Sequence, residues 1–473
     1  MNFETLYSWV RDLPIVDWHN HLDLAALAED KPLGSLYEVW VKTDPYKHRA
    51  MRICGEPERV ITGEASEEEK WSAWTRTLPK LVGNPLFAWA KMEMEKLKVE
   101  SGKWKVVDGT AKIENISLAE WTPSKMLKKF NVEYLSPCVG AGEFLTGFTR
   151  FTGLRDERGM NPVNPVDPVQ KTLNVVPSLR MNAGDEISIE TLEKFDAAGC
   201  RVVDISVDDA SQLSTFNSQL STVAAYAATR GWTMLLHMGA LRETSARLRA
   251  VAGPVGGFAG MRAPVDPVSV AAFLNMLEVG DFSHKEQEKQ KSFLSRKDRK
   301  EISAHSASLG TRSARLGSLQ IASPACAAVT RLCVKNNPVQ NSLPRTILMT
   351  LNPEAHAALA VLAGSFNEAG MPGKVQLGPA WWWCDHEEGI RDVLEKNAAY
   401  GVLSTFVGMT TDSRSLLSFV RHDYFRRVLC KWVAEKVALG AFPDDESLLR
   451  PMLENICYRN AKAMVSDGCA IRA

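Results

Sequence analysis

Short apolar runs rich in β-forming residues recur along the chain, and most are separated by intervals long enough to hold a helix. Eight runs fit this description: 15–19, 131–137, 174–180, 200–206, 232–238, 345–352, 374–380 and 403–414. Within the intervals, apolar residues recur every three to four positions, which is typical of amphipathic helices. The clearest examples are 189–199, 218–231, 356–370 and 390–401, and each ends in glycine, a common residue at a helix C-terminus. Strands that alternate with helices form a parallel sheet, and eight such units predict an α/β fold, a (β/α)8 TIM-type barrel.

Two intervals are much too long for a single crossover helix. The first, 25–128, carries several helical patterns rich in tryptophan, and we expect a helical insert after the first strand in which the tryptophans serve packing. The second, 278–340, begins with a charge run and continues into a Ser/Ala-rich stretch without a period. We expect it to be an atypical, disordered insertion that does no chemistry. With these two inserts, 1–473 is interpreted as one barrel domain.

Composition excludes some classes of function. The 473 residues include 56 Lys and Arg and 56 Asp and Glu, so the net charge is zero and a nucleic-acid partner is not favoured. No apolar run reaches membrane-spanning length, and 1–14 is expected to be a short amphipathic helix instead of a signal peptide. The nine cysteines form no CxxC motif. A reducing compartment fits this usage, and we expect a cytoplasmic protein without a membrane partner.

Two histidines follow the first predicted strand at alternate positions. Residues i and i+2 of a strand point to the same side, so His19 and His21 can aim both imidazoles at one ion. Asp412 lies at the end of the eighth predicted strand, which neighbours the first in a closed barrel. Two imidazoles and one carboxylate leave coordination positions free, as in catalytic zinc sites. Zn²⁺ suits these ligands, and Mn²⁺ and Fe²⁺ remain alternatives.

Three arginines also follow predicted strands, at Arg180, Arg242 and Arg414. Guanidinium groups bind carboxylates in bidentate fashion, and no glycine-rich phosphate loop is present, so a carboxylate or a hydroxylated acid is the expected ligand. His237 ends the fifth predicted strand. Several of these residues also have a structural interpretation: His237 as a satisfied core histidine, Asp412 as the cap of a helix starting at Ser413, Arg414 as an ion-pair partner of Asp412, and Arg180 as a surface residue after a strand.

Several stretches resemble the uronate isomerases, also called glucuronate isomerases, of the amidohydrolase superfamily. They include "PIVDWHNHL", "DPYKHRAMRICG", "VPSLR", "LHMGALRETSARL", "GKVQLGPAWWWCD" and "FVGMTTDSRSLLSFVRHDYFRRVLC". The resemblance covers nearly the whole chain except about 278–340. It implies a distorted (β/α)8 barrel with a helical insert after the first strand. It also implies aldose–ketose isomerisation of a hexuronate, such as D-glucuronate to D-fructuronate or D-galacturonate to D-tagaturonate.

The resemblance also implies roles for individual residues. It makes His19, His21 and Asp412 the ligands of one divalent metal, with no organic cofactor. Substrate contacts fall on Tyr46, Arg180, His237, Arg242 and Arg414, with Trp381 as a pocket wall. We expect Tyr46 to transfer the proton between C2 and C1 through an enediol(ate), and His237 to support a substrate hydroxyl. Asp412 could also accept a hydroxyl proton during ring opening. The expected partner is a small-molecule hexuronate, and a homo-oligomer is compatible with the sequence.

The chain departs from the family pattern at three places. Pro45 stands where some members carry histidine, the second strand ends in "SPCVGAG" without an acidic pair, and Ile205 follows Asp204 where a histidine is common. These departures keep open a non-catalytic relative that binds sugar acids. A metal-dependent hydrolase is the third hypothesis; it is disfavoured because the fourth strand has no lysine and the sixth ends at Asn352.

Overall fold

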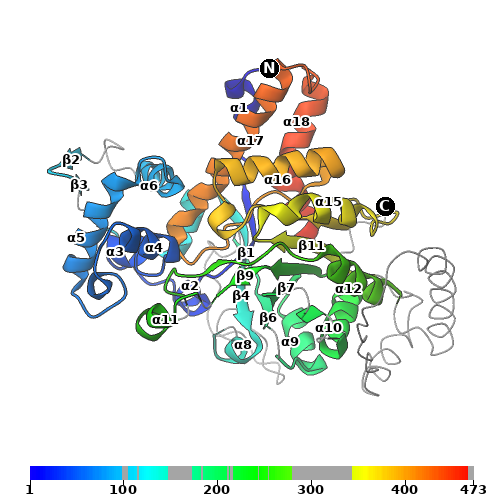
Figure 1. Ribbon diagram of the computed structural model, residues 1–473, viewed down its shortest axis with the longest axis horizontal. Helices are drawn as coiled ribbons and strands as arrows, with labels where there is room; N and C mark the ends of the chain where they lie inside the picture. The colour runs from blue at the N-terminus through cyan, green and yellow to red at the C-terminus, as the bar shows by residue number, and fades with distance from the viewer. Residues whose placement is uncertain are drawn as a thin grey trace, which may run out of the picture.

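A parallel β-sheet organises the computed structural model of the chain (Figure 1). The structure describes residues 1–97, 105–113, 117–147, 173–182, 185–209, 212–213, 217–242, 244–253, 255–279 and 343–466. Apart from its first two residues, the predicted insertion 278–340 lies outside these ranges.

Seven strands of this sheet follow one another in chain order, β1-β4-β6-β7-β8-β11-β12. Their bounds are Ile15–Asn20, Val132–Gly140, Ser178–Asn182, Val202–Val207, Thr233–Met238, Arg345–Thr350 and Val375–Leu377. Every pair is parallel, and the short β5 (Asn174–Val175) pairs with β4. Residues of β7 and β8 are buried throughout, as expected of strands covered on both faces. The predicted α/β barrel class is therefore confirmed, and the seven strands coincide with seven of the eight predicted runs.

The prediction of an eighth strand at 403–414 is wrong. This segment begins with a 3-10 turn, η7 (Leu403–Thr405), and continues without regular structure between β12 and β1. Side chains replace most of the expected ladder: Gln376 Oε1 accepts from the Val407 N–H at 2.8 Å, and Asp17 Oδ1 accepts from the Thr411 N–H at 2.7 Å. Among the described residues, the backbone bonds from this segment to its neighbours are those from the Asp412 N–H to the His19 carbonyl, 3.2 Å, and from the His21 N–H to the Ser413 carbonyl, 2.9 Å. The segment therefore joins the first and last strands without being one.

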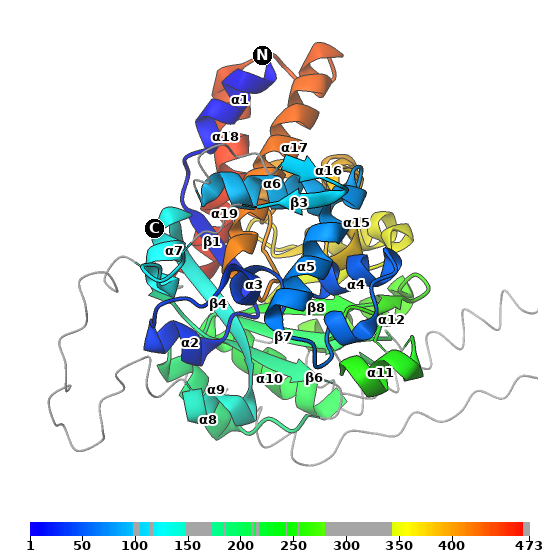
Figure 2. The same cartoon turned by 90° about the vertical axis from the view of Figure 1, so that its left-hand side faces the viewer.

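Helices pack around the sheet (Figures 1 and 2). After the barrel strands come α8 (Ala141–Gly147), α9 (Ile189–Ala197), α10 (Asn217–Arg230), α11 (Ala246–Ala252), α12 (Pro267–Val279), α15 (His356–Gly364), α16 (Glu387–Tyr400) and α17 (Val420–Ala438). Gly199 and Gly231 take positive φ just after α9 and α10, as predicted. However, α15 ends six residues before the predicted Gly370, because Asn367 bonds the Ala363 and Val375 carbonyls and so leads the chain into β12.

Residues between β1 and β4 form a mainly helical excursion, at the left of Figure 1. It contains α2 (Leu24–Glu29), α3 (Leu36–Trp40), α4 (Pro45–Ile53), α5 (Glu67–Thr77), α6 (Pro85–Lys96), α7 (Pro123–Lys129) and a hairpin of β2 (Lys105–Val107) and β3 (Thr110–Lys112). Trp40 and Trp74 are fully buried and meet edge to face at 5.5 Å. These two tryptophans thus serve packing, in a hydrophobic core that continues into the barrel.

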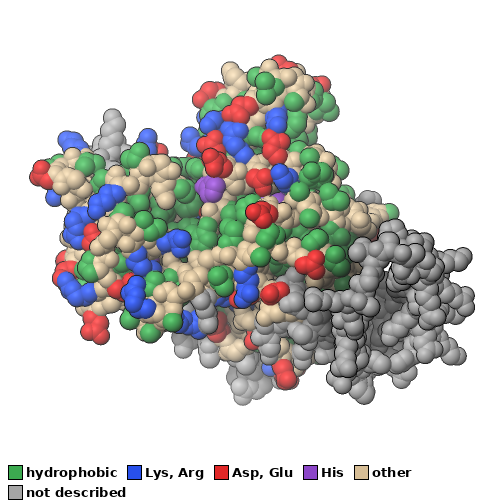
Figure 3. Space-filling view, in the orientation of Figure 1, with side chains coloured by type: hydrophobic (Ala, Val, Ile, Leu, Met, Phe, Trp, Pro, Cys, Tyr) green, Lys and Arg blue, Asp and Glu red, His purple; other side chains and the backbone are tan. Residues whose placement is uncertain are grey.

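The first helix packs against helices from the C-terminal part of the described chain. Helix α1 (Phe3–Val10) packs on α17 and α18 (Glu446–Glu454), and α19 (Asn460–Val465) packs on β1. Acidic and basic side chains are interspersed on the face shown in Figure 3, in keeping with the balanced net charge. Among the described residues, none of the helices has the length and apolar character needed to cross a bilayer.

Candidate active site

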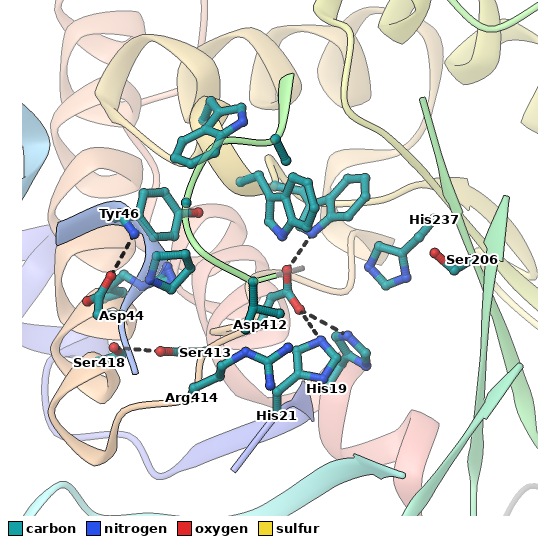
Figure 4. Close-up of a pocket in the computed structure, with 18 of the residues that line it drawn as sticks. His19, His21, Asp44, Tyr46, Ser206, His237, Asp412, Ser413, Arg414 and Ser418 are labelled. Carbon is teal, nitrogen blue, oxygen red and sulfur yellow. Dashed lines mark hydrogen bonds and ion pairs between the residues drawn. The ribbon is translucent and has the colours of Figure 1, made fainter. Parts of the chain in front are cut away.

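A pocket opens where the barrel strands end and the helical excursion covers them (Figure 4). Its empty space is about 1050 Å³ when the open solvent at its mouth is counted. All nine residues that the sequence nominated line this pocket: His19, His21, Tyr46, Arg180, His237, Arg242, Trp381, Asp412 and Arg414. Residues nearly 400 positions apart in sequence therefore share one cavity, while their individual roles remain predictions.

Two imidazoles converge on one carboxylate at the floor of the pocket (Figure 4). His19 Nε2 lies 3.2 Å and His21 Nε2 3.0 Å from Asp412 Oδ1. Trp381 Nε1 donates to the other oxygen of Asp412. Asp412 itself adopts a left-handed φ of 46°, an uncommon backbone for a residue other than glycine that turns its carboxylate toward β1.

Two effects determine the pKa values in this cluster: burial of the side chains, and the contacts between the histidines and the nearby carboxylates. The two histidine contacts overcome burial and hold the pKa of the Asp412 carboxyl well below its usual range. Burial lowers the pKa of His21 to about 4. Burial opposes the charged form of His19 as well, but the carboxylates of Asp204 and Asp412 raise its pKa well above the ordinary value.

The donor set fits a divalent metal ion. One ligand atom from each of His19, His21 and Asp412 lies within 4.8 Å of the other two. Metal bonds of about 2.0–2.2 Å in tetrahedral geometry place neighbouring donors roughly 3.3–3.6 Å apart. The nitrogen-to-oxygen separations of 3.0 and 3.2 Å are close to the lower end of that range, so a small ion needs little rearrangement. His19 also forms a second group of ligand atoms with Cys138 and Asp204.

Asp204 organises a buried polar network beside the first cluster. Its Oδ1 lies 2.6 Å from His237 Nδ1, and its Oδ2 accepts from Arg180 and from the Cys138 thiol, both at 3.3 Å. Burial would raise the pKa of Asp204, but the charges of His237, His19 and Arg180 lower it, so the carboxylate stays ionised. An ionised Asp204 makes Nδ1 the protonated nitrogen of His237. The other nitrogen, Nε2, is buried and has no hydrogen-bond partner among the described residues.

The three arginines differ in how far they are already paired. Arg180 contacts Asp204, and Arg242 donates to Asp208 at 2.9 Å and to the Ser206 hydroxyl at 2.5 Å. Within the described ranges, the side chain of Arg414 is exposed at the pocket and has no ion pair and no hydrogen bond. A guanidinium without a protein partner is free to bind an anionic ligand.

Tyr46 enters the pocket from the first turn of α4. Asp44 caps this helix by accepting from the Tyr46 N–H at 2.9 Å, and Pro45 occupies the first helical position, where proline is favoured. The Tyr46 hydroxyl donates to Asp385 Oδ2 at 3.0 Å. Burial and the nearby Asp385 charge raise the pKa of Tyr46 well above its ordinary value, so the phenol stays protonated at neutral pH.

Four functional-looking residues escaped the sequence analysis as site members: Asp17, Asp204, Asp385 and Arg421. A charged residue in an otherwise apolar buried run is a usable signal for Asp17 and Asp204, since isolated charges are costly to bury. Asp385 and Arg421 gave no such signal, because their pairing depends on tertiary contact. The capping alternative for Asp412 is wrong: the next turn, η8 (Leu416–Phe419), is capped by Ser415. Asn352 caps a 3-10 turn, η5 (Pro353–Ala355), and does not line the pocket.

Comparisons with known proteins agree with this geometry. The family model for glucuronate isomerase matches residues 2–137 and 318–465. A uronate isomerase from Geobacillus thermodenitrificans is 31% identical over 522 aligned positions, which cover 97% of this chain and 95% of the relative.

Solved structures show the same fold at lower identity. A uronate isomerase from Thermotoga maritima aligns with a TM-score of 0.72 at 22% identity over 98% of this chain and 97% of its own. A glucuronate isomerase from Caulobacter crescentus aligns with a TM-score of 0.67 at 18% identity, over 98% and 93% of the two chains. Because the family model matches more than half of the chain and the curated relative spans nearly all of it, the chain belongs to the glucuronate isomerase family.

Proposed function

We propose that this protein isomerises a hexuronate, converting the open-chain aldose to its ketose by moving a proton from C2 to C1. The observation that carries the proposal is the meeting, in one pocket, of a two-histidine, one-carboxylate cluster with three guanidinium groups. Family membership supports the same reaction. D-Glucuronate and D-galacturonate are the candidate substrates.

We assign His19, His21 and Asp412 as the ligands of one divalent ion, with Zn²⁺ as the first candidate. Such an ion would act as a Lewis acid that polarises a substrate oxygen. The three ligands come from β1, from the residue after it and from the segment that closes the barrel, so the closure of the barrel and the ion site depend on one another.

Substrate orientation falls to the arginines and to Trp381. Arg414 has no partner of its own among the described side chains, so it is the best placed to bind the substrate carboxylate in bidentate fashion. Arg180 and Arg242 add positive charge at the same mouth, and each is held by a carboxylate. Trp381 is held by its bond to Asp412, and its ring centroid lies 4.6 Å from that of His237 with the planes tilted by 55°, which makes it a rigid wall for the sugar chain.

Proton transfer is assigned to Tyr46, with His237 and Asp412 in support. The unpartnered Nε2 of His237 can accept a hydrogen bond from a substrate hydroxyl, because its Nδ1 donates to Asp204. Asp412 is ionised and can accept a hydroxyl proton as the sugar ring opens. The enediolate between the two carbons gains stabilisation from the cationic groups of the pocket. The cytoplasmic location and a homo-oligomer stay predictions.

Purified, metal-loaded protein incubated separately with D-glucuronate and D-galacturonate tests this proposal. Ketose should appear in an amount equal to the aldose lost, up to an equilibrium mixture, for at least one of the two. The Arg414→Met variant serves as the matched control for the site. If folded, metal-loaded wild-type protein leaves both sugars unchanged, a non-catalytic sugar-acid-binding protein becomes the better account.

A further inference from the structure

Tyr46 belongs to a chain of three interacting side chains, of which Tyr46 and Arg421 line the pocket. Asp385 Oδ2 accepts from the Tyr46 hydroxyl at 3.0 Å and from Arg421 at 2.8 Å. Asp385 lies at the end of the 3-10 turn η6 (Trp382–Cys384), and Arg421 lies in the first turn of α17. Their side chains are only 9% and 4% exposed, so both charges are kept from water and depend on each other.

Arg421 ties this chain to the segment that carries Asp412. A second guanidinium nitrogen donates to the Thr411 carbonyl at 2.5 Å, one residue before Asp412. The flat face of the guanidinium lies 5.5 Å from the Tyr46 ring and 4.9 Å from the Trp89 ring. The position of Tyr46 is therefore coupled to the position of Asp412.

The direction of the hydrogen bond determines what Tyr46 offers to a substrate. Because the phenol donates its only proton to Asp385, the oxygen presents lone pairs to the pocket, into which the hydroxyl points in Figure 4. A neutral phenol is a weak base by itself. It becomes effective only if its own proton can leave as a new one arrives.

We infer that Asp385 and Arg421 are positioning residues that act through Tyr46, with Asp385 as the acceptor for the phenol proton during isomerisation. This inference rests on the proposed function. As the C2–H bond breaks, the proton moves to Tyr46 Oη, the Oη–H proton moves to Asp385 Oδ2, the electron pair left at C2 forms the C1=C2 bond, and the π pair of the C1 carbonyl passes to O1 as the enediolate charge. In the second half, the O2–H proton passes to O1 and its electron pair forms the C2 carbonyl. The C1=C2 pair then takes the proton from Tyr46 Oη at C1 while Asp385 returns its proton to Oη, so Tyr46 and Asp385 end as they began. Arg421 holds Asp385 in line throughout.

Burial agrees with this role. It raises the pKa of Asp385, against the opposing charge of Arg421, so the carboxylate is a better proton acceptor than an exposed one. The charged groups that act on Tyr46 are Asp385, Arg421 and, more distantly, Asp412.

A double-mutant cycle tests the inference. Asp385→Asn retains an oxygen that can accept the phenol hydrogen bond, but it cannot take the proton. We expect kcat for the hexuronate to fall about 100-fold with little change in KM, the lower range for one proton-transfer group. In the Tyr46→Phe background the same substitution should change kcat less than about twofold, because the phenol hydroxyl through which Asp385 acts is absent. Equal losses in both backgrounds, or no loss in the single variant, would overturn the inference.

The chain supplies a matched control outside the pocket. Tyr7 donates to Asp423, Arg427 donates to the same carboxylate at 3.0 Å, and its guanidinium lies 4.7 Å from the Tyr7 ring. This is the same trio of side chains between α1 and α17. Asp423→Asn should leave kcat unchanged, which separates a general effect of losing such a carboxylate from the effect at Tyr46.

A spectroscopic readout keeps this inference distinct from the proposed function. Tyrosine labelled with ¹³C at Cζ gives one resonance for each of the eight tyrosines, and Tyr46 is assigned by its absence in Tyr46→Phe. Asp385→Asn should lower the pH at which the Tyr46 resonance titrates, whereas Asp423→Asn should not move it. An unmoved Tyr46 resonance in Asp385→Asn would refute the inference even in an active isomerase. Absence of turnover in wild-type protein would refute the proposed function instead.

Discussion

At the scale of single residues, the pocket combines side chains that are already paired with a few that are not. Asp204, Asp385 and Arg242 have their partners in the protein, whereas Arg414 and the Nε2 atom of His237 have none among the described residues. The buried Nε2 atom costs stability while it is unpaired, and the exposed guanidinium of Arg414 is free to pair, so both mark places where a ligand is expected to bind.

Arg414→Met should therefore impair catalysis while leaving the fold intact. Loss of a charge-assisted contact is worth about 1.5–3 kcal/mol, which corresponds to a fall of about 10- to 150-fold in kcat/KM. Steady-state kinetics with the hexuronate measures it. Arg59→Met, which removes a surface arginine paired with Glu69, is the control and should retain full activity. Wild-type kinetics in Arg414→Met would remove this residue from the site.

His21→Ala should reduce bound metal. Removing one of three protein ligands leaves a site with too few donors to retain Zn²⁺ through dialysis, so the metal content per chain should fall well below that of wild type. Elemental analysis after gel filtration measures it. His386→Ala, at the cap of α16, is the control histidine. Equal metal content in the His21 variant and wild type would contradict the ligand assignment.

At the scale of elements, the periodicity of apolar residues predicted seven strands and most of the helices around them. It failed at 403–414, because the contacts that hold this segment come from the Asp17 and Gln376 side chains and leave no periodic trace. It also failed at the end of α15, where Asn367 bonds the backbone locally. A segment that is held by one or two side chains shows no hydrophobic periodicity, so a pattern taken over many residues does not detect it.

Gly257, in the loop after α11, lies against α4, the helix that carries Tyr46. A Cβ at Gly257 would lie 2.1 Å from the Pro45 carbonyl oxygen, and its φ is +77°. Gly257→Ala should destabilise the protein by about 1–3 kcal/mol and lower kcat, because α4 must move away from the loop. Thermal unfolding and kinetics measure both effects. Gly253→Ala has a similar φ of +68° but nothing within 4 Å of the added methyl, so it should show the backbone strain without the loss of kcat. Equal kcat in the two variants would sink the argument.

His48 makes the stability of the same helix depend on pH. It is buried and neither ring nitrogen has a partner among the described residues, and burial lowers its pKa to about 4. Because the unfolded chain binds the proton near pH 6.5 and the folded chain only near 4, stability is full above pH 6.5 and falls as the pH drops toward 4. The loss from this group is about 3 kcal/mol. Urea unfolding of wild type and His48→Gln from pH 7 to 4 measures it, and parallel profiles would contradict it.

At the scale of the whole molecule, the sequence predicted the barrel, the helical excursion and nine residues that line one pocket. Seven of them were found because they end or follow predicted strands, and strand ends of a barrel share one face. Tyr46 and Trp381 were nominated only by the resemblance to a known family. Asp385 and Arg421 were not found, since 36 positions separate them and only the packing of α17 against the turn after β12 brings them together. The order of the strands can be inferred from the hydrophobic pattern. The polar network of Asp385 and Arg421 depends on tertiary contacts, which that pattern does not predict.

The most direct test of the account is the fate of the substrate protons in D₂O. NMR of wild-type protein with D-glucuronate or D-galacturonate should show the ketose with deuterium entering at C1, and Tyr46→Phe should slow both events together by about 10²–10⁴-fold. Solvent exchange arises because the proton on Tyr46 can equilibrate with water between its removal from C2 and its return to C1. Ketose formed at an unchanged rate by Tyr46→Phe would contradict the proton-transfer site, and no ketose from folded, metal-loaded wild-type protein would contradict the isomerase itself.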